Sequence, residues 1–305
     1  MKPSPYNRYA ETTILAYLAG TLFFTILLHR FIPGWGALAG IQLAAGAFLL
    51  GWARLQDRFP GNRLLAGVRA WLPLPYVLFG YRLIHFLVCC DRNCGLLPDR
   101  DCWLIAADRF LFGTDPTIWL QRIVNPILTE AMQIIYATNY FLPAILVLAL
   151  YLSRDRTAFQ HSVWVLTLGY ILSYLGYFII PAIGPRLTLE HAIPLQGVML
   201  REKLAALNYA LEAVPRDCFP SGHTELPLVT LWLAFRHRRP LARVYLPIVL
   251  LLICSTVYLR YHYVIDVLAG AALAGIVILA GRATLPPGGQ AAETSPELDK
   301  PGNKS

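Results

Sequence analysis

The sequence predicts an all-α membrane protein, a polytopic bundle of about eight transmembrane helices. Of its 305 residues, 56% are hydrophobic and only 14% are charged, and the mean hydropathy is +0.51. A soluble domain carries about 25% charged residues. The apolar residues gather into long runs, and a run of about 20 can cross the hydrocarbon core of a bilayer as a helix. Together these observations place the chain in a membrane.

The net charge of +8 would favour a nucleic-acid partner if the basic residues formed one patch. They recur instead in short loops between the apolar runs, which is the distribution that the positive-inside rule describes. We therefore expect the lipid bilayer to be the partner of this chain, and no nucleic acid.

The apolar runs predict eight spans, at about 12–31, 35–53, 71–90, 128–152, 160–181, 222–235, 244–259 and 263–281. The first five are long enough to cross the bilayer, and the last three are short, which is tolerated among longer neighbours or beside a recessed site. Residues 1–11 lack the cleavage site of a signal peptide, so the first span is expected to be retained. Residues 283–305 are rich in Pro, Gly, Ser and charge, and are expected to form a disordered tail.

An even number of spans places both chain termini on one side of the membrane. The loops of that side carry Lys2, Arg8, Arg54, Arg58, Arg63, Arg69, Arg154, Arg156, Arg236, Arg238, Arg239, Arg243 and Arg282. Only Glu11, Asp57 and Asp155 oppose these cations, so the charge bias makes this the cytoplasmic side. We expect a multi-pass protein of a bacterial inner membrane, with residues 182–221 and the 260–262 junction together on the extracytoplasmic face.

Residues 91–127 do not form a ninth span, because charged residues interrupt their apolar pattern: Asp108, Arg109, Asp115 and Arg122. Thr114-Asp115-Pro116 predicts a helix start with proline just inside it. An apolar face follows from Phe110, Leu111, Phe112, Ile118, Trp119 and Ile123. We expect helices that lie in the outer membrane interface, or an ordinary packed lid, and the two interpretations are compatible.

Four of the six cysteines fall in or beside this loop: Cys89, Cys90, Cys94 and Cys102. Zinc binding would need a second His/Cys pair at ligand spacing, which the sequence lacks. One or two disulfide bonds are expected if the loop faces an oxidising compartment, and the pairing stays open.

Two motifs carry the chemistry. The first, Arg-Asp-Cys-Phe-Pro-Ser-Gly-His, covers residues 216–223 and leads into a helical run. Ser221 can cap that helix, and the free amide groups of its first turn, which contains His223, can face an anion. The second, Arg-Tyr-His-Tyr-Val-Ile-Asp, covers residues 260–266. His262 and Asp266 are four apart and share one helix face, so the carboxylate can hold the imidazole in one tautomer and leave its other nitrogen free to attack.

The two motifs together resemble those of the type 2 phosphatidic acid phosphatase superfamily, and their wording resembles the inositol phosphorylceramide synthase-type branch. The resemblance covers about residues 71–281 and implies a six-helix core. It makes His262 the nucleophile, Asp266 its orienting partner and His223 the acid for the leaving group. It places Ser221 and the Gly222 amide on the phosphate oxygens. It implies neither a metal nor a cofactor.

The chain departs from the family pattern in its arginines. Ser255 and Thr256 stand where the family has Ser-Arg before the nucleophile, and the Lys-x6-Arg-Pro signature is absent. The substitutes for the phosphate-binding arginines are Arg186, which follows Gly184-Pro185, then Arg260 and Arg216. Arg260 can serve only if the helix starts near residue 262, because two positions away on a helix it would point elsewhere.

Three further residues are polar within apolar runs. Arg82 and His85 share a face of the third span and either contact phosphate or a headgroup, or snorkel to the outer interface. Glu225 lies close to His223 and either hydrogen-bonds within the bundle or tunes that histidine.

From these motifs we expect two N-terminal spans (1–68), a membrane-embedded phosphatase or phosphotransferase core (69–282, with the interfacial segment 91–127) and the tail. The expected function is cleavage or transfer of a lipid-linked phosphate through a phosphohistidine, with transfer of an inositol phosphate-type headgroup implied by the branch. The simpler alternative is a polyprenyl pyrophosphate or phosphatidic acid phosphatase. A transporter is a more remote alternative, because intramembrane charges are few and no inverted repeat is visible.

Overall fold

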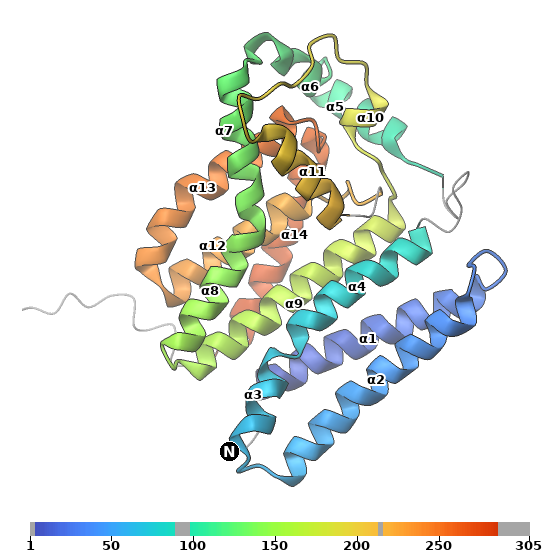
Figure 1. Cartoon of the computed structure of the whole chain (residues 1–305), viewed down its shortest axis with the longest axis vertical. Helices are drawn as coiled ribbons and strands as arrows, with labels where there is room; N and C mark the ends of the chain where they lie inside the picture. Colours follow the sequence, from blue (N-terminus) through green and yellow to red (C-terminus); the bar gives the residue numbers. More distant parts are fainter. Residues whose placement is uncertain (1–3, 89–97, 213–215, 286–305) are drawn as a thin grey trace, which may run out of the picture.

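The computed structural model describes residues 4–88, 98–212 and 216–285. Every regular element in these ranges is a helix (Figure 1): α1 (Pro5–Leu27), α2 (Trp35–Arg58), α3 (Arg63–Trp71), α4 (Pro73–Val88), α5 (Asp101–Phe112), α6 (Pro116–Trp119), η1 (Leu120–Ile123), α7 (Pro126–Ala137), η2 (Thr138–Tyr140), α8 (Phe141–Leu152), α9 (Arg156–Ile179), α10 (Pro185–Thr188), α11 (Arg201–Glu212), α12 (Gly222–His237), α13 (Arg239–Tyr258) and α14 (Val264–Ala283). The prediction of an all-helical fold is confirmed.

Within the described ranges, seven helical segments are long and apolar enough to cross a membrane: Pro5–Leu27, Trp35–Arg58, Arg63–Val88, Pro126–Leu152, Arg156–Ile179, Arg239–Tyr258 and Val264–Ala283. The remaining predicted span, 222–235, corresponds to α12, which has 16 residues. At about 1.5 Å per residue α12 is about 24 Å long, less than the hydrocarbon thickness of about 30 Å. It packs against α8, α9, α13 and α14, so a short helix is accommodated inside the bundle.

Helices α1, α7, α9 and α13 begin before the apolar runs that predicted them, whereas α2 and α12 begin where predicted. Ser4 is the N-cap of α1 and accepts a hydrogen bond from the Tyr6 amide. Asp155 is the N-cap of α9, and its carboxylate accepts from the Ala158 amide at 3.0 Å. The predicted starts at 12 and 160 were late because a helix continues through polar turns that lie outside the hydrocarbon, and its caps mark its ends better than its hydropathy does.

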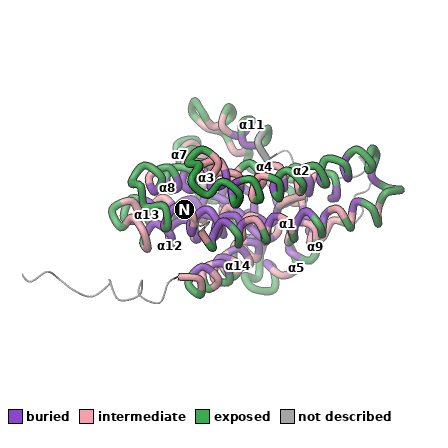
Figure 2. Tube along the Cα trace, turned by 90° about the horizontal axis from the view of Figure 1, so that it is seen from below, coloured by how far each residue is buried: buried purple, intermediate pink, exposed green. Residues whose placement is uncertain are grey.

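The centre of the bundle is α9. In the apolar segment of α9 that could cross a membrane, 61% of the residues are buried inside the structure, against 22% in the corresponding segment of α2. Helices α1, α4, α12 and α14 all pack against α9, and α2 packs against α1 and α3 at the edge of the molecule (Figures 1 and 2). The first N-terminal span therefore belongs to the packed bundle.

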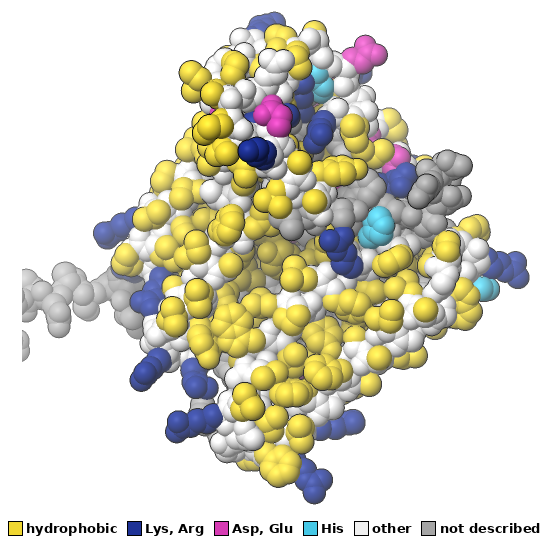
Figure 3. All heavy atoms as spheres, in the orientation of Figure 1, with side chains coloured by type: hydrophobic (Ala, Val, Ile, Leu, Met, Phe, Trp, Pro, Cys, Tyr) yellow, Lys and Arg dark blue, Asp and Glu magenta, His cyan; other side chains and the backbone are white. Residues whose placement is uncertain are grey.

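The outer surface is largely apolar. Figure 3 shows hydrophobic side chains over the body of the molecule, Lys and Arg around its margins and in its upper half, and the acidic side chains of this face near the top. At that end α5, α6, α10 and α11 lie over the ends of the spans (Figure 1). Phe110 of α5 is 88% exposed and Trp119 is 53% exposed. These exposed rings fit the expected interfacial segment. Helix α6 starts as predicted, with Asp115 as N-cap and Pro116 as its first residue.

Two expectations lie outside the described residues. They are the disulfide pairing of Cys89, Cys90 and Cys94, and the state of most of the tail, residues 286–305.

Candidate active site

The two sequence motifs meet at one end of the bundle. His223 lies in the first turn of α12, and His262 lies in the turn between α13 and α14. Nδ1 of His223 is 3.5 Å from Nε2 of His262, and the ring centroids are 5.6 Å apart. His262 is only 4% exposed. The fold therefore brings together two imidazoles that the sequence separates by two apolar runs.

Asp266 lies in the first turn of α14 and is fully buried. Its Oδ2 is 3.6 Å from Nδ1 of His262, which leaves Nε2 as the nitrogen that faces His223. The same Oδ2 accepts a hydrogen bond from the Tyr263 amide at 2.9 Å. Asp266 and His262 thus lie together at an ion-pair distance rather than in a short hydrogen bond. They do not share a helix face as the four-residue spacing predicted, because His262 lies in the turn before α14.

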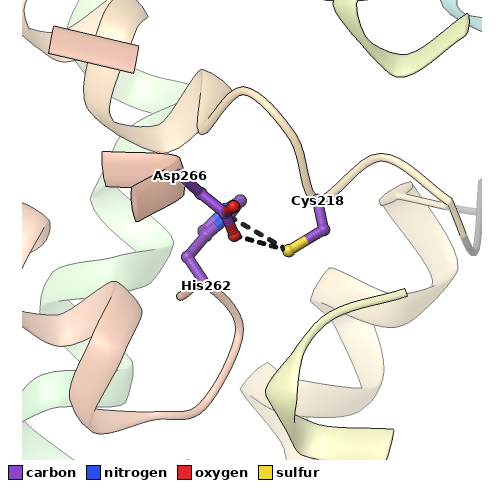
Figure 4. A group of neighbouring side chains, drawn as sticks. All are labelled: Cys218, His262 and Asp266. Atoms are coloured by element: carbon purple, nitrogen blue, oxygen red, sulfur yellow. Dashed lines mark hydrogen bonds and ion pairs between the residues drawn. The ribbon is translucent and has the colours of Figure 1, made fainter. Parts of the chain in front are cut away.

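Cys218 completes this group (Figure 4). Its Sγ donates to Oδ2 of Asp266 at 2.9 Å and lies 3.6 Å from Nδ1 of His262. Burial raises the pKa of the Cys218 thiol well above its usual range, and the neighbouring Asp266 carboxylate raises it further. The thiol therefore stays protonated and acts as a hydrogen-bond donor to the carboxylate. Sequence reasoning missed this role, although Cys218 lies within the first motif.

The same three residues offer a possible metal-binding group. Sγ of Cys218, a ring nitrogen of His262 and a carboxylate oxygen of Asp266 all lie within 4.8 Å of one another. Thiolate, imidazole and carboxylate are the ligand types that zinc takes. The Cys218 thiol is held protonated beside Asp266, however, so it is not in the thiolate form that binds zinc.

Close packing of α12 on α14 fixes the two motifs relative to each other. The Ser221 amide donates to the backbone carbonyl of Asp266 at 3.1 Å. A Cβ at Gly270, one turn further along α14, would collide with the carbonyl of Ser221. Glycine is therefore required at position 270, because α14 passes directly against the first turn of α12.

Ser221 is the residue before α12, as predicted, but its side chain makes no capping bond. Its Oγ accepts from Oγ1 of Thr224 at 3.1 Å instead. The next residue, Gly222, packs against Tyr177. A Cβ added at Gly222 would lie 2.6 Å from the Tyr177 hydroxyl. Position 222 is thus closely packed, and a larger residue there would force the Tyr177 side chain to move.

The three candidate arginines have different surroundings. Arg186 is exposed, and its guanidinium carbon lies 5.8 Å from the ring centroid of Tyr261. Arg260 is 7% exposed and donates from Nη2 to the Ile193 carbonyl at 2.6 Å, while its buried Nε has no hydrogen-bond partner in the described part of the chain. Arg260 has φ +67° and lies in the turn before α14. It is therefore outside the helix, as a phosphate-binding role for Arg260 requires.

Arg216 is held by an acidic neighbour. Its Nε lies 2.5 Å from Oδ1 of Asp99, and its Nη2 lies 3.3 Å from Oδ2. A guanidinium that already forms a bidentate pair has less capacity left for a phosphate. Of the three arginines, Arg260 has the buried, partly unsatisfied guanidinium that an anion site needs.

An aromatic stack supports His223. The ring of Tyr136 from α7 lies between His223 and Tyr261, with centroids 4.5 Å from each, and is only 1% exposed. Oη of Tyr136 is 3.4 Å from Nδ1 of His223. The stack fixes the plane of the imidazole, and no motif in the sequence pointed to Tyr136.

Helix α5 holds both loops of the site. The Asp108 carboxylate accepts from the amides of Val264 and Ile265 at 2.9 and 2.8 Å, which are the first amides of α14. The Asp101 carboxylate accepts from the amides of Ile183 and Gly184 at 2.9 and 2.8 Å. In the sequence Asp108 appeared only as an interruption of an apolar pattern, because its partners lie more than 150 positions away.

The remaining polar candidates lie outside the histidine pair. Glu225 is fully buried and accepts a hydrogen bond from Ser173 of α9, so it does bond within the bundle. Arg82 is exposed and His85 is half-buried on α4, and the structure records no hydrogen bond from Nδ1 of His85 in its described portion. Beside them, the Tyr81 hydroxyl donates to Asp217 at 2.6 Å, which ties α4 to the first motif.

Comparison with known proteins adds one match. A family model described as the PAP2 superfamily matches residues 102–280, more than half of the chain and both histidine motifs. No curated protein and no solved structure matches the chain.

Proposed function

The chain belongs to the PAP2 superfamily, and on that premise we propose that it is an integral membrane phosphatase that acts on lipid phosphate through a phosphohistidine. The observation that carries the proposal is the 3.5 Å approach of His223 to His262, with Asp266 behind the latter. One imidazole is held from behind with its Nε2 free, and the second lies where a leaving oxygen would depart. Nucleophilic and general acid catalysis need such a pair.

The proposed reaction has two steps. Nε2 of His262 attacks the phosphorus, the bond from phosphorus to the lipid oxygen breaks, and His223 gives its proton to that oxygen. Water then attacks the phosphohistidine while His223 takes one proton from it, and the bond from phosphorus to nitrogen breaks. Arg260, Arg186 and the amide of Gly222 supply positive charge and donors for the phosphate oxygens, where charge gathers in the transition state.

In the structure the two imidazoles touch, so there is no room for a phosphorus atom between them. Substrate must therefore separate them. His223 is the ring that can move, since it is half-exposed and lies at the start of its helix, whereas His262 is enclosed by Cys218 and Asp266. Sliding of His223 along the Tyr136 ring would open the gap without breaking the stack.

A second candidate is transfer of the phosphoryl group, or of a phosphorylated headgroup of inositol phosphate type, to an alcohol. The residue sequence of both motifs supports it, because it resembles that of the inositol phosphorylceramide synthase-type branch. The burial of His262, which is 4% exposed, also supports it, because a phosphoenzyme shielded from water lasts long enough to meet an alcohol. Incubation of the purified protein with phosphatidic acid, with and without candidate alcohols, measures both products. Absence of both products would refute both candidates.

Labelled phosphoenzyme separates the two histidines. With p-nitrophenyl phosphate, whose leaving group barely needs a proton, His223→Ala should still form the adduct and His262→Ala should form none. The adduct should be acid-labile and base-stable, as a phosphoramidate is. An adduct in His262→Ala alone would reverse the two roles, and a base-labile, acid-stable adduct would exclude a phosphohistidine.

A further inference from the structure

A cavity of about 430 Å³ lies at the end of the bundle opposite the histidine pair. It is lined by Trp232, Phe235, Arg236, Arg239, Arg243 and Arg282. Arg236 lies near the end of α12, the helix that starts beside His223, and about 20 Å of helix separates them. Arg239 begins α13, and Arg282 lies in the last turn of α14. Three helices therefore direct four arginines to one place.

The lining contains four cations and no acidic residue. Four guanidinium groups around one space create a positive potential there, which attracts an anion. Arginine also presents paired N–H donors that match phosphate oxygens, which makes it the preferred residue for phosphate recognition. The chemistry of the cavity therefore calls for a phosphate group.

A simpler explanation would assign these arginines to the carbonyl groups at helix ends, where cations are favourable. Arg238 plays that part, since its Nη2 donates to the Ala149 carbonyl at 3.1 Å, and it does not line the cavity. Arg236 and Arg282 lie in the last turns of α12 and α14, where a cation is favourable, but Arg239 and Arg243 lie at the start of α13, where it is not. Helix ends therefore account for two of the four arginines and not for the other two.

The walls of the cavity identify the rest of the ligand. Trp232 and Phe235 lie on the same side of α12 as Arg236, and Phe235 is 42% exposed. Arg239 and Arg282 mark the ends of two membrane-crossing segments, so the cavity lies at the depth of the lipid headgroups. Tryptophan favours that depth, and basic pockets between transmembrane helices suit anionic headgroups. A phosphate that carries acyl chains fits both the cations and the aromatic wall.

We propose that this arginine-lined cavity binds the headgroup phosphate of an anionic phospholipid, at a site separate from the histidine pair. The guanidinium groups hold the phosphate, and Trp232 and Phe235 contact the start of its acyl chains. The site does not depend on catalysis, and it would retain its lipid in a protein without turnover.

The test uses the full chain in zwitterionic detergent micelles with phosphatidylglycerol as the probe. The triple variant R239Q/R243Q/R282Q should bind it on the order of a hundredfold more weakly, since each arginine near an anionic surface contributes about fivefold. The matched control R54Q/R58Q/R156Q removes three cations predicted to lie on the same membrane side but outside the cavity. It should change binding less than threefold. Equal losses in the two variants would overturn the proposal.

Two further measurements localise and identify the ligand. A photoactivatable phosphatidylglycerol should crosslink to the α12 peptide that contains Trp232 and Phe235, and crosslinks confined to the histidine end would overturn the site. Inorganic phosphate at equal concentration should not displace the lipid, and if it did, the ligand would be free phosphate. If the triple variant fails to fold, R243Q alone should show about a fivefold loss, because Arg243 is exposed and can be replaced without disturbing the core.

Discussion

Asp108 of α5 caps the helix that begins at Val264. Its carboxylate accepts from the amides of Val264 and Ile265, and these groups would otherwise have no partner in the helix. Burial raises the pKa of Asp108, and the two amide bonds oppose that rise. A residue from the interfacial segment thus fixes the start of α14 at Val264, two residues after His262. The same helix carries Asp266.

Asp108→Ala should lower the free energy of unfolding by about 2 kcal/mol, because it leaves two buried amides unsatisfied. Turnover should fall as well, since the 262–266 turn loses its anchor. Asp108→Asn keeps one acceptor oxygen and should lose less. Thermal unfolding and initial rates in detergent would measure both. Arg109→Ala is the matched control on the same helix, because its side chain is 57% exposed and its pair with Asp115 contributes little. An equal effect of the two alanine variants would contradict the capping role.

Arg186→Ala should reduce turnover on the order of 100-fold if the guanidinium stabilises transition-state oxygens. Arg186→Lys keeps the charge and should recover part of the rate. Arg216→Ala should cost less in turnover, because the Asp99 pair already engages that guanidinium. A change under threefold in folded Arg186→Ala would leave Arg260 as the clamp.

Cys218 should resist alkylation at pH 8. The raised pKa of its thiol means that thiolate, the reactive form, is scarce at a pH where an ordinary cysteine has begun to ionise. Once any disulfide bonds of the cysteine-rich loop have been reduced, iodoacetamide should therefore leave the enzyme active and modify the exposed Cys102 first. Peptide mass spectrometry after timed exposure measures both sites. Rapid labelling of Cys218 with loss of activity would show that the thiol is accessible and ionised.

Topology follows from the charge bias and stays a prediction. Alkaline phosphatase fused at position 195 should be active in a bacterial host, and a fusion at position 239 should be inactive. The reverse pattern would place the histidine pair in the cytoplasm and remove the reason to expect disulfides in the cysteine-rich loop.

The fold class was predictable because membrane spans leave a strong signal in hydropathy. The short α12 was predictable from its motif more than from its length, since 16 residues fall below an ordinary span. Helix ends were not predictable from hydropathy, because polar turns and caps such as Ser4 and Asp155 extend the helices beyond the hydrocarbon.

The histidines and Asp266 were predictable because they lie in contiguous motifs. The roles of Cys218, Tyr136 and Asp108 were not, since each acts on a residue far away in the sequence. A buried thiol, an aromatic ring and a capping carboxylate each look ordinary along the chain, even where, like Cys218, they lie inside a motif. Only tertiary packing brings Cys218 to Asp266, Tyr136 to His223 and Asp108 to the start of α14.

Helix α5 has two different sides. On one side Asp101 and Asp108 accept hydrogen bonds from the backbone near Arg186 and at the start of α14. On the other side Phe110 extends outward with 88% of its surface exposed. One helix thus carries both the exposed aromatic residue and the carboxylates that hold the two loops. A change in the depth of α5 in the membrane interface would therefore move the turn that holds His262. Bilayer thickness and headgroup packing would then act on the reaction mechanically, through a helix that touches none of the reacting atoms.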